Sequence, residues 1–306
     1  LHILRERLAP HFLDQRLIFR DQRLQVGRSH FGVEVVAAIF LGDFQRFFEP
    51  AMVEAEHDVR IVYAVESGSR AWGFASADSD FDVRFLYLHR PAWYLAIDKR
   101  RDVIEYAIVD EIDLAGWDLP KALGLFFKSN PPLFEWLRSP LIYREVGPVA
   151  EGLRGLAPAF YDPRAGFHHY LHMAESNVRA ELRKERIRHK KYFYVLRPVL
   201  SCLWIDADGT TPPMELQPLV ERFLPDGPVR EEVDRLLVAK RAGTEADAGP
   251  RLPALHAYLE DELADLAVRA GDQPKPPRSV EPLNAFLVAS LKAVWPDDPF
   301  WSRSGG

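Results

Sequence analysis

The chain has 306 residues, of which 47% are hydrophobic, 12% aromatic and 27% charged, as is typical of globular proteins. Its net charge of −6 disfavours a protein that coats nucleic acid non-specifically, because that binding mode needs many Lys and Arg residues over a broad surface. The longest purely apolar run, 35–41, is far shorter than the roughly 20 residues of a membrane-spanning helix, so no membrane partner is expected.

The first half of the chain predicts a mixed sheet with helices. Apolar residues at helical spacing predict a helix over 32–48, which Pro50 is expected to close. Alternating or β-branched segments predict strands at 60–65, 81–88, 103–109 and from 112 onward. Two helices are expected next, over 121–128 and 131–139, with a break at Ser129 and Asn130.

From residue 162 onward the apolar pattern is helical almost to the end. Helices are expected at 164–188, 191–205, 229–239, 254–270 and 283–293, separated by stretches rich in Pro, Gly and Asp. A sheet with helices followed by helices alone indicates an α+β fold. We predict an N-terminal extension at 1–30, an α+β domain at 31–147 and a helical domain at 148–306.

The cellular compartment is suggested by the single cysteine and by the first residues. Cys202 excludes an internal disulfide, and its apolar neighbours predict a buried thiol in a reducing compartment. Residues 1–30 carry scattered charges and lack the continuous apolar segment of a secretory signal. We therefore expect a cytoplasmic protein.

Two carboxylates interrupt an otherwise apolar strand. In an extended chain the side chains alternate between faces, so Asp80, Asp82 and Arg84 point one way while the apolar residues between them point the other. Two neighbouring carboxylates repel each other, and a divalent cation between them would relieve that repulsion. Mg²⁺ is the expected cation, because it binds oxygen ligands and often combines one or two carboxylates with substrate phosphates.

A third carboxylate would complete such a metal site. Asp113 is the preferred candidate, because it lies between Ile112 and Leu114 in an apolar, strand-like triplet. Asp118 is the alternative, although its position directly before Leu119 and Pro120 favours the role of a helix cap.

A short turn before the carboxylate strand offers a phosphate contact. Gly68 allows the backbone to approach a phosphate closely, and Ser69 adds a hydroxyl and a backbone N–H. No phosphate-binding loop of the Gly-x-x-x-x-Gly-Lys-Ser/Thr type is present, so a P-loop enzyme is disfavoured.

The spacing Gly68-Ser69-x10-Asp80-x-Asp82 resembles the signature of the DNA polymerase β-type nucleotidyltransferase superfamily. The segments SGSRAWGFASADSDFDVRFLY, EIDLAGWDLPKAL, NPPLFEWLRSPLIY and KKYFYVLRPVLSCLW are similar to a bacterial and phage branch of predicted nucleotidyltransferases associated with RNA repair. The likeness runs over about 55–225.

The resemblance implies a site for a nucleoside triphosphate and metal. Gly68 and Ser69 would hold the triphosphate, while Asp80, Asp82 and Asp113 would be catalytic and would hold two Mg²⁺ ions. The position of Asp113 is less firmly fixed by motif than the other two. Arg84 shares the metal face, where it would neutralise phosphate charge or balance the carboxylates.

The segment 179–191 reverses the acidic balance of the chain. It contains seven basic and two acidic residues, hence a net charge of +5. It is interpreted either as a solvated helix face or as a contact for a triphosphate or an RNA backbone. Lys191 is the preferred nucleotide-binding residue, because Tyr192 and Tyr194 could place aromatic rings beside its charge, although both tyrosines equally suit a helix core.

We therefore expect a Mg²⁺-dependent nucleotidyltransferase that binds an NTP such as ATP, transfers its nucleoside monophosphate to a hydroxyl and releases pyrophosphate. An RNA end is the favoured acceptor, on the strength of the resemblance alone. Two alternatives stay open. The acceptor could be a hydroxyl of a protein or small molecule, or the chain could be a non-catalytic sensor of nucleotides or RNA ends.

Overall fold

The computed structural model describes residues 49–77, 79–109, 111–244, 248–270 and 278–302, and all of them belong to a single compact unit. The expected extension at 1–30 and helix at 32–48 lie outside the described residues. Pro50 was expected to close a helix, but it is the first residue of helix α3 (Pro50–His57). At that position the missing N–H of proline leaves no helical hydrogen bond unmade.

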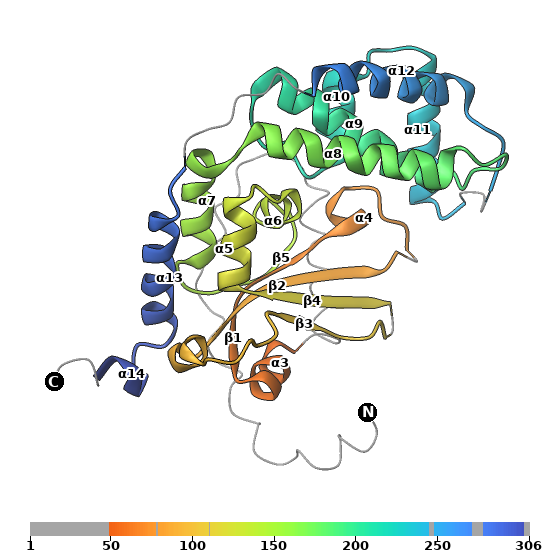
Figure 1. Cartoon of the computed structure of the whole chain (residues 1–306). Coiled ribbons are helices and arrows are strands. Elements are labelled where there is room, and N and C mark those ends of the chain that lie inside the picture. Colours follow the sequence, from red (N-terminus) through yellow and green to blue (C-terminus); the bar gives the residue numbers. More distant parts are fainter. Residues whose placement is uncertain (1–48, 78, 110, 245–247, 271–277, 303–306) are drawn as a thin grey trace, which may run out of the picture. The chain divides into compact units, whose positions relative to one another are not determined.

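A five-stranded mixed sheet forms the centre of the first half, in the order β3-β4-β2-β1-β5 (Figure 1). Its strands are β1 (Val59–Glu66), β2 (Phe81–His89), β3 (Val103–Glu105), β4 (Ile112–Asp118) and β5 (Ile142–Glu145). The β2 and β4 strands run parallel, and every other neighbouring pair is antiparallel. The predicted α+β class, with a mixed sheet and a helical C-terminal region, is confirmed.

Helices cover one face of this sheet. Helices α5 (Leu119–Phe127) and α6 (Pro131–Trp136) are separated as predicted, because Ser129 adopts a φ of 55° and the Asn130 side chain accepts a hydrogen bond from Leu133 N at 3.4 Å. Helices α7 (Val149–Phe160) and α13 (Glu281–Val294) contribute to the same hydrophobic core (Figure 1). The opposite face of the sheet packs with Val53 of α3 in a smaller core.

A second core lies within the helices of the C-terminal half. Its helices are α8 (Pro163–Asn177), α9 (Lys190–Asp208), α10 (Leu216–Phe223), α11 (Pro228–Arg241) and α12 (Pro253–Arg269). Cys202 is fully buried there, and burial raises the pKa of its thiol. Further short helices are α4 (Gly68–Ala71), η1 (Pro91–Leu95) and α14 (Pro299–Ser302).

The expected helix at 164–188 is wrong at its C-terminal end. Helix α8 ends at Asn177, a π-helical turn follows over Val178–Leu182, and 183–189 is irregular. Exposed charged residues fill most of that irregular stretch, whereas Ile187 is buried and pairs with Gly249. Among the described residues, no helix combines the length and the apolar character needed to cross a membrane.

Candidate active site

The Gly-Ser turn is built directly against the carboxylate strand. Gly68 and Ser69 follow β1 and begin the short helix α4 (Gly68–Ala71), and Gly68 adopts a left-handed φ of 58°. A Cβ at this position would lie 1.9 Å from Oδ2 of Asp82, which is too close for any side chain. The Ser67 N–H also donates to the Asp82 carbonyl at 2.8 Å. The left-handed φ favours glycine here, and a Cβ would force the Asp82 carboxylate, which lies directly over Gly68, to move.

Asp113 lies beside Asp82 on the neighbouring strand. The parallel register of β2 and β4 pairs these two residues, and Arg84 bridges them. Its Nη2 donates to Asp113 Oδ2 at 2.7 Å and to Asp82 Oδ1 at 3.3 Å, and its Nη1 donates to the Asp113 carbonyl at 2.8 Å. The structure thus places Asp113 beside Asp82, and Arg84 balances both carboxylates.

Asp80 and Asp82 share a polar pocket of about 150 Å³. The other residues that line it come from the turn, from the segment before β2 and from helices α9 and α11: Ser69, Phe74, Ser79, Lys190, Tyr194 and Lys240. Two carboxylates, two ammonium groups and an exposed aromatic ring therefore face one cavity. Such a set can bind a polyanion together with a cation, and can stack a base.

Arg70 fixes the backbone that carries Asp80. Its Nη2 donates to the Ser79 carbonyl at 2.5 Å and its Nε donates to the Asp80 carbonyl at 3.1 Å. Its guanidinium lies 3.8 Å from the centre of the Phe81 ring, and the residue is only 9% exposed. The sequence did not single out this residue, because Arg70 reaches its partners across the turn.

Aromatic residues after the turn anchor it to helix α9. The Phe74 ring stacks on Phe193 at 4.7 Å, and the Trp72 ring lies 5.7 Å from that of Tyr194. The Trp72 carbonyl also accepts from Leu216 N at 3.0 Å. These contacts hold the Gly-Ser turn against the helical core, so Trp72 packs beneath the turn.

The two lysines that line the pocket are not Lys191, which the sequence analysis preferred for nucleotide binding. Lys190 and Lys240 line the pocket, and Lys240 Nζ donates to Ser76 Oγ at 2.8 Å. Lys191 instead lies 3.9 Å from Glu181 and 4.8 Å from the centre of the Tyr194 ring. Its role in nucleotide binding stays a prediction, and it would act through Tyr194. No local pattern marks Lys240, which lies on the distant helix α11.

The carboxylates form two overlapping pairs. Asp80 and Asp82 share the pocket, while Asp82 and Asp113 share Arg84. Within the part of the chain that the structure describes, no three His, Cys, Asp or Glu side chains gather closely enough to hold a metal ion. Convergence of all three carboxylates on metal therefore stays a prediction.

The donor set nevertheless fits a hard divalent cation. Burial raises the pKa of Asp82, the Arg84 charge opposes this rise, and repulsion from Asp113 and Asp80 adds to it. A group held among like charges in this way is stabilised when a cation binds between them. Asp80 and Asp82 are the residues best placed to hold one, because both face the pocket.

Glu66, at the end of β1, is a buried acid that sequence reasoning missed. It is 0% exposed, and its Oε1 accepts from the Asp82 backbone N–H at 2.8 Å while Tyr143 donates to its Oε2. Burial raises its pKa from 4.5 to about 7, and the charge of Asp82 adds to the rise. Glu66 therefore supports the backbone of Asp82 from inside the sheet.

This acid is expected to make stability fall as the pH rises. Because the pKa of Glu66 is raised in the folded chain, the folded protein keeps a proton on this carboxyl group that the unfolded chain loses above about pH 4.5. The resulting loss in the free energy of unfolding grows between pH 4.5 and pH 7 and reaches about 3 kcal/mol above that range. Urea unfolding from pH 5 to pH 8 should show Glu66→Gln losing less stability than wild type, and equal losses would contradict this account.

Asp118 occupies the N-cap position of helix α5, as the sequence favoured, but its side chain does not cap the helix. It ends β4, is only 4% exposed and makes no side-chain capping hydrogen bond. Its Oδ1 accepts from the Tyr94 hydroxyl at 2.6 Å instead, and burial raises its pKa to about 7. Tyr94, which comes from helix η1, is therefore the side-chain partner of this carboxylate.

The chain resembles known proteins over most of its length. The family model described as "RNA repair pathway DNA polymerase beta family" matches residues 48–289. A relative from Bacillus subtilis (strain 168), named "Uncharacterized protein YcgL", is 44% identical over 246 residues, which cover 80% of this chain and 95% of that protein. A solved structure of a nucleotidyltransferase-like protein from Exiguobacterium sibiricum 255-15 matches 78% of this chain and 77% of that one, with 16% identity and a TM-score of 0.30.

Proposed function

Because the chain belongs to the RNA repair pathway DNA polymerase beta family, a family of nucleotidyltransferase type, we propose that it transfers a nucleoside monophosphate from an NTP to an acceptor hydroxyl. The observation that carries this proposal is the Asp82 carboxylate, which lies over Gly68 and faces a pocket with two lysines. Pyrophosphate is the leaving group. The oxygen of the acceptor attacks the α-phosphorus, and the bond from that phosphorus to the β-phosphate oxygen breaks.

The side chains around the pocket divide the work. Lys190 and Lys240 supply positive charge to the triphosphate, and Ser69 supplies a hydroxyl close to it. Tyr194, which is 36% exposed, offers a face for the base. ATP and other NTPs share this triphosphate chemistry, so the proposed binding mode does not depend on the base.

Asp80, Asp82 and Asp113 are the proposed catalytic carboxylates and the proposed ligands of two Mg²⁺ ions. When bound, Mg²⁺ supplies positive charge that activates the acceptor hydroxyl and stabilises the departing pyrophosphate. Arg84 holds Asp113 next to Asp82, and Arg70 holds the backbone of Asp80. In this arrangement Asp113 is the proposed acceptor of the hydroxyl proton.

An RNA end is the proposed acceptor. The family description names an RNA repair pathway, and the basic segment 179–191 includes Lys190, which lines the pocket. Part of its charge is used internally, because Lys184 and Arg188 both bind Glu181, at 2.7 and 3.0 Å. Arg183 is exposed and, with its basic neighbours, is suited to contact a phosphate backbone.

The residues that line the pocket come from both proposed domains. The proposed catalytic domain, 31–147, carries the carboxylates and the Gly-Ser turn, and the proposed helical domain, 148–306, supplies Lys190, Tyr194 and Lys240. Helices α7 and α13 of the helical domain pack beside the sheet.

We place the reaction in the cytoplasm, where NTPs are abundant and a buried thiol such as that of Cys202 stays reduced.

A label-transfer experiment tests this proposal. Wild-type protein with Mg²⁺ and each α-³²P-labelled NTP is incubated with tRNA, with nicked RNA and with cell extract, and labelled products are separated from free nucleotide. We expect label on RNA and equimolar pyrophosphate. Label on protein or on a small molecule would keep the chemistry and change the acceptor, whereas NTP binding without transfer to any acceptor would favour a sensor.

A further inference from the structure

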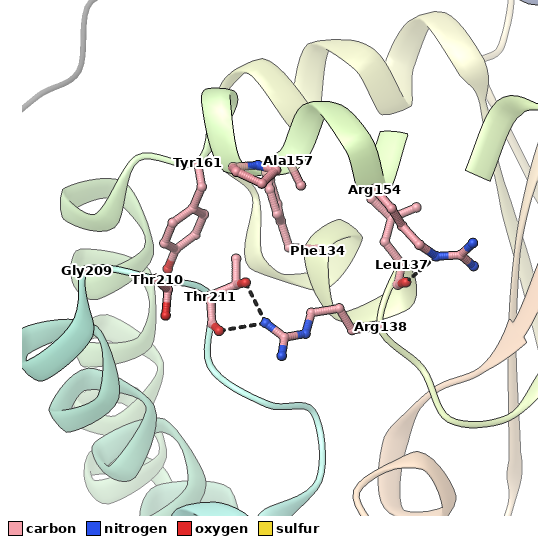
Figure 2. Close-up of a pocket in the computed structure, with 10 residues that line it drawn as sticks. Phe134, Leu137, Arg138, Arg154, Ala157, Tyr161, Gly209, Thr210 and Thr211 are labelled. Atoms are coloured by element: carbon pink, nitrogen blue, oxygen red, sulfur yellow. Dashed lines mark hydrogen bonds between the residues drawn. The ribbon is translucent and has the colours of Figure 1, made fainter. Parts of the chain in front are cut away.

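A cavity among the described residues is separate from the nucleotide pocket. It has a volume of about 390 Å³ and shares no lining residue with the pocket of Asp80 and Asp82. It lies among helix α6, helix α7 and the loop 209–211 that follows helix α9 (Figure 2). Cavities of roughly 300–1,000 Å³ are the usual size for sites that bind small molecules.

The walls of this cavity are mostly apolar. Phe134 and Leu137 come from α6 and the turn after it, and Ala157 and Pro158 come from α7. The Tyr161 ring closes the side next to the loop that carries Thr210 and Thr211, as Figure 2 shows. A ligand would therefore present an aromatic or aliphatic body to most of the cavity.

Two arginines line the cavity, and only one is neutralised by a carboxylate. The Arg154 guanidinium donates to both carboxylate oxygens of Glu145 at 2.7 Å, and it also donates to the Leu137 carbonyl at 2.9 Å. Arg138 Nη1 donates only to neutral oxygens, the carbonyl and the hydroxyl of Thr211, at 2.8 and 2.7 Å (Figure 2). Among the described residues, no carboxylate forms an ion pair with Arg138.

The Tyr161 ring lines the cavity, but its hydroxyl is buried beside Gly166 of helix α8. Tyr161 is 8% exposed, and within the described residues its hydroxyl makes no hydrogen bond. A ligand in the cavity would therefore meet the Tyr161 ring and not its hydroxyl. The cavity thus combines apolar walls with a positive charge that has no counter-ion among the described residues.

We propose that this cavity binds a small amphipathic anion, with an aromatic or aliphatic body against Phe134 and Ala157 and one carboxylate or sulfonate group on Arg138. Thr211 orients the guanidinium toward the anion, because it fixes Nη1 and leaves the other nitrogens available. The ligand would contact α6, α7 and the loop after α9 at once. This inference is independent of the proposed transfer reaction.

Two fluorescent probes that differ in charge test the site. The first is 8-anilinonaphthalene-1-sulfonate, and the second is N-phenyl-1-naphthylamine, which has the same aromatic body without the sulfonate. Titration of wild-type protein should show saturable binding of the sulfonate probe at least tenfold tighter than that of the neutral probe. Equal affinities, or the absence of a saturable site, would overturn the proposal.

Variants locate the binding. Arg138→Met should weaken binding of the sulfonate probe at least tenfold and leave the neutral probe unchanged, whereas Arg138→Lys should retain most of the affinity. Ala157→Phe should fill the cavity and weaken both probes. Arg235→Met, which removes an exposed arginine of α11, is the matched control. A melting temperature close to that of wild type shows that each variant is folded. If neither Arg138→Met nor Ala157→Phe changed the affinity for the sulfonate probe, the proposed site would be refuted.

Discussion

Asp82→Asn should reduce nucleotide transfer by at least about 100-fold while leaving the fold intact. The carboxylate lies over Gly68, faces the nucleotide pocket and is coupled to both other acids, so its charge acts where the triphosphate would react. Asparagine keeps the shape and can still accept from Arg84, but it removes the negative charge. The measurement is pyrophosphate release with Mg²⁺, an NTP and the acceptor identified by label transfer.

The same substitution should not lower stability. Burial and the repulsion from Asp113 and Asp80 raise the pKa of Asp82, so the ionised group opposes folding at neutral pH. The melting temperature of Asp82→Asn should therefore equal or exceed that of wild type. Asp234→Asn, at a 51% exposed carboxylate of α11, is the control and should keep full activity. An active Asp82→Asn protein would remove this residue from the proposed mechanism.

The centre of this site could be predicted because its geometry is local. Alternation along one strand places Asp82 and Arg84 on a common face, and the structure confirms their contact. Gly68 could likewise be recognised from its turn, whereas the closeness of the Asp82 carboxylate to it is seen only in the folded structure. Asp113 required one more step, because its place beside Asp82 depends on the register of two strands separated by other elements.

The supporting residues could not be predicted because their partners are distant in sequence. In the sequence, Glu66 is one acidic residue at the end of a predicted strand. Only the folded sheet brings the Tyr143 hydroxyl to its carboxylate. Lys240 reaches the pocket from helix α11 and contacts Ser76 near the turn. Only tertiary packing shows that these side chains belong to one site.

The missed elements of the fold have weak local patterns. Strand β5 has four residues at the edge of the sheet, and Ile142 is 41% exposed, so no clear alternation marks it. Helix α7 contains two glycines and an internal proline, which sequence rules assign to turns. Its apolar face is nevertheless buried, with Val149 and Leu153 at 0% exposure. Burial of this face stabilises a helix that propensity alone disfavours.

Gly68→Ala should damage both stability and activity. The left-handed φ of 58° costs a non-glycine residue roughly 1–2 kcal/mol, and the added Cβ would lie 1.9 Å from Asp82 Oδ2. The carboxylate or the turn must therefore move. A shift of about 1 Å in a group that positions substrate can cost roughly 100-fold in rate. We expect a loss of about 1–3 kcal/mol in the free energy of unfolding and at least a 100-fold loss of transfer.

Gly147→Ala separates strain from displacement. Gly147 has a similar left-handed φ of 71°, but a Cβ there would meet no atom within 4 Å. This variant should lose about 1–2 kcal/mol of stability from backbone strain and retain wild-type activity. Urea unfolding and pyrophosphate release, measured on both variants, compare the two effects directly. If Gly68→Ala lost no more activity than Gly147→Ala, the contact between the turn and Asp82 would have no part in catalysis.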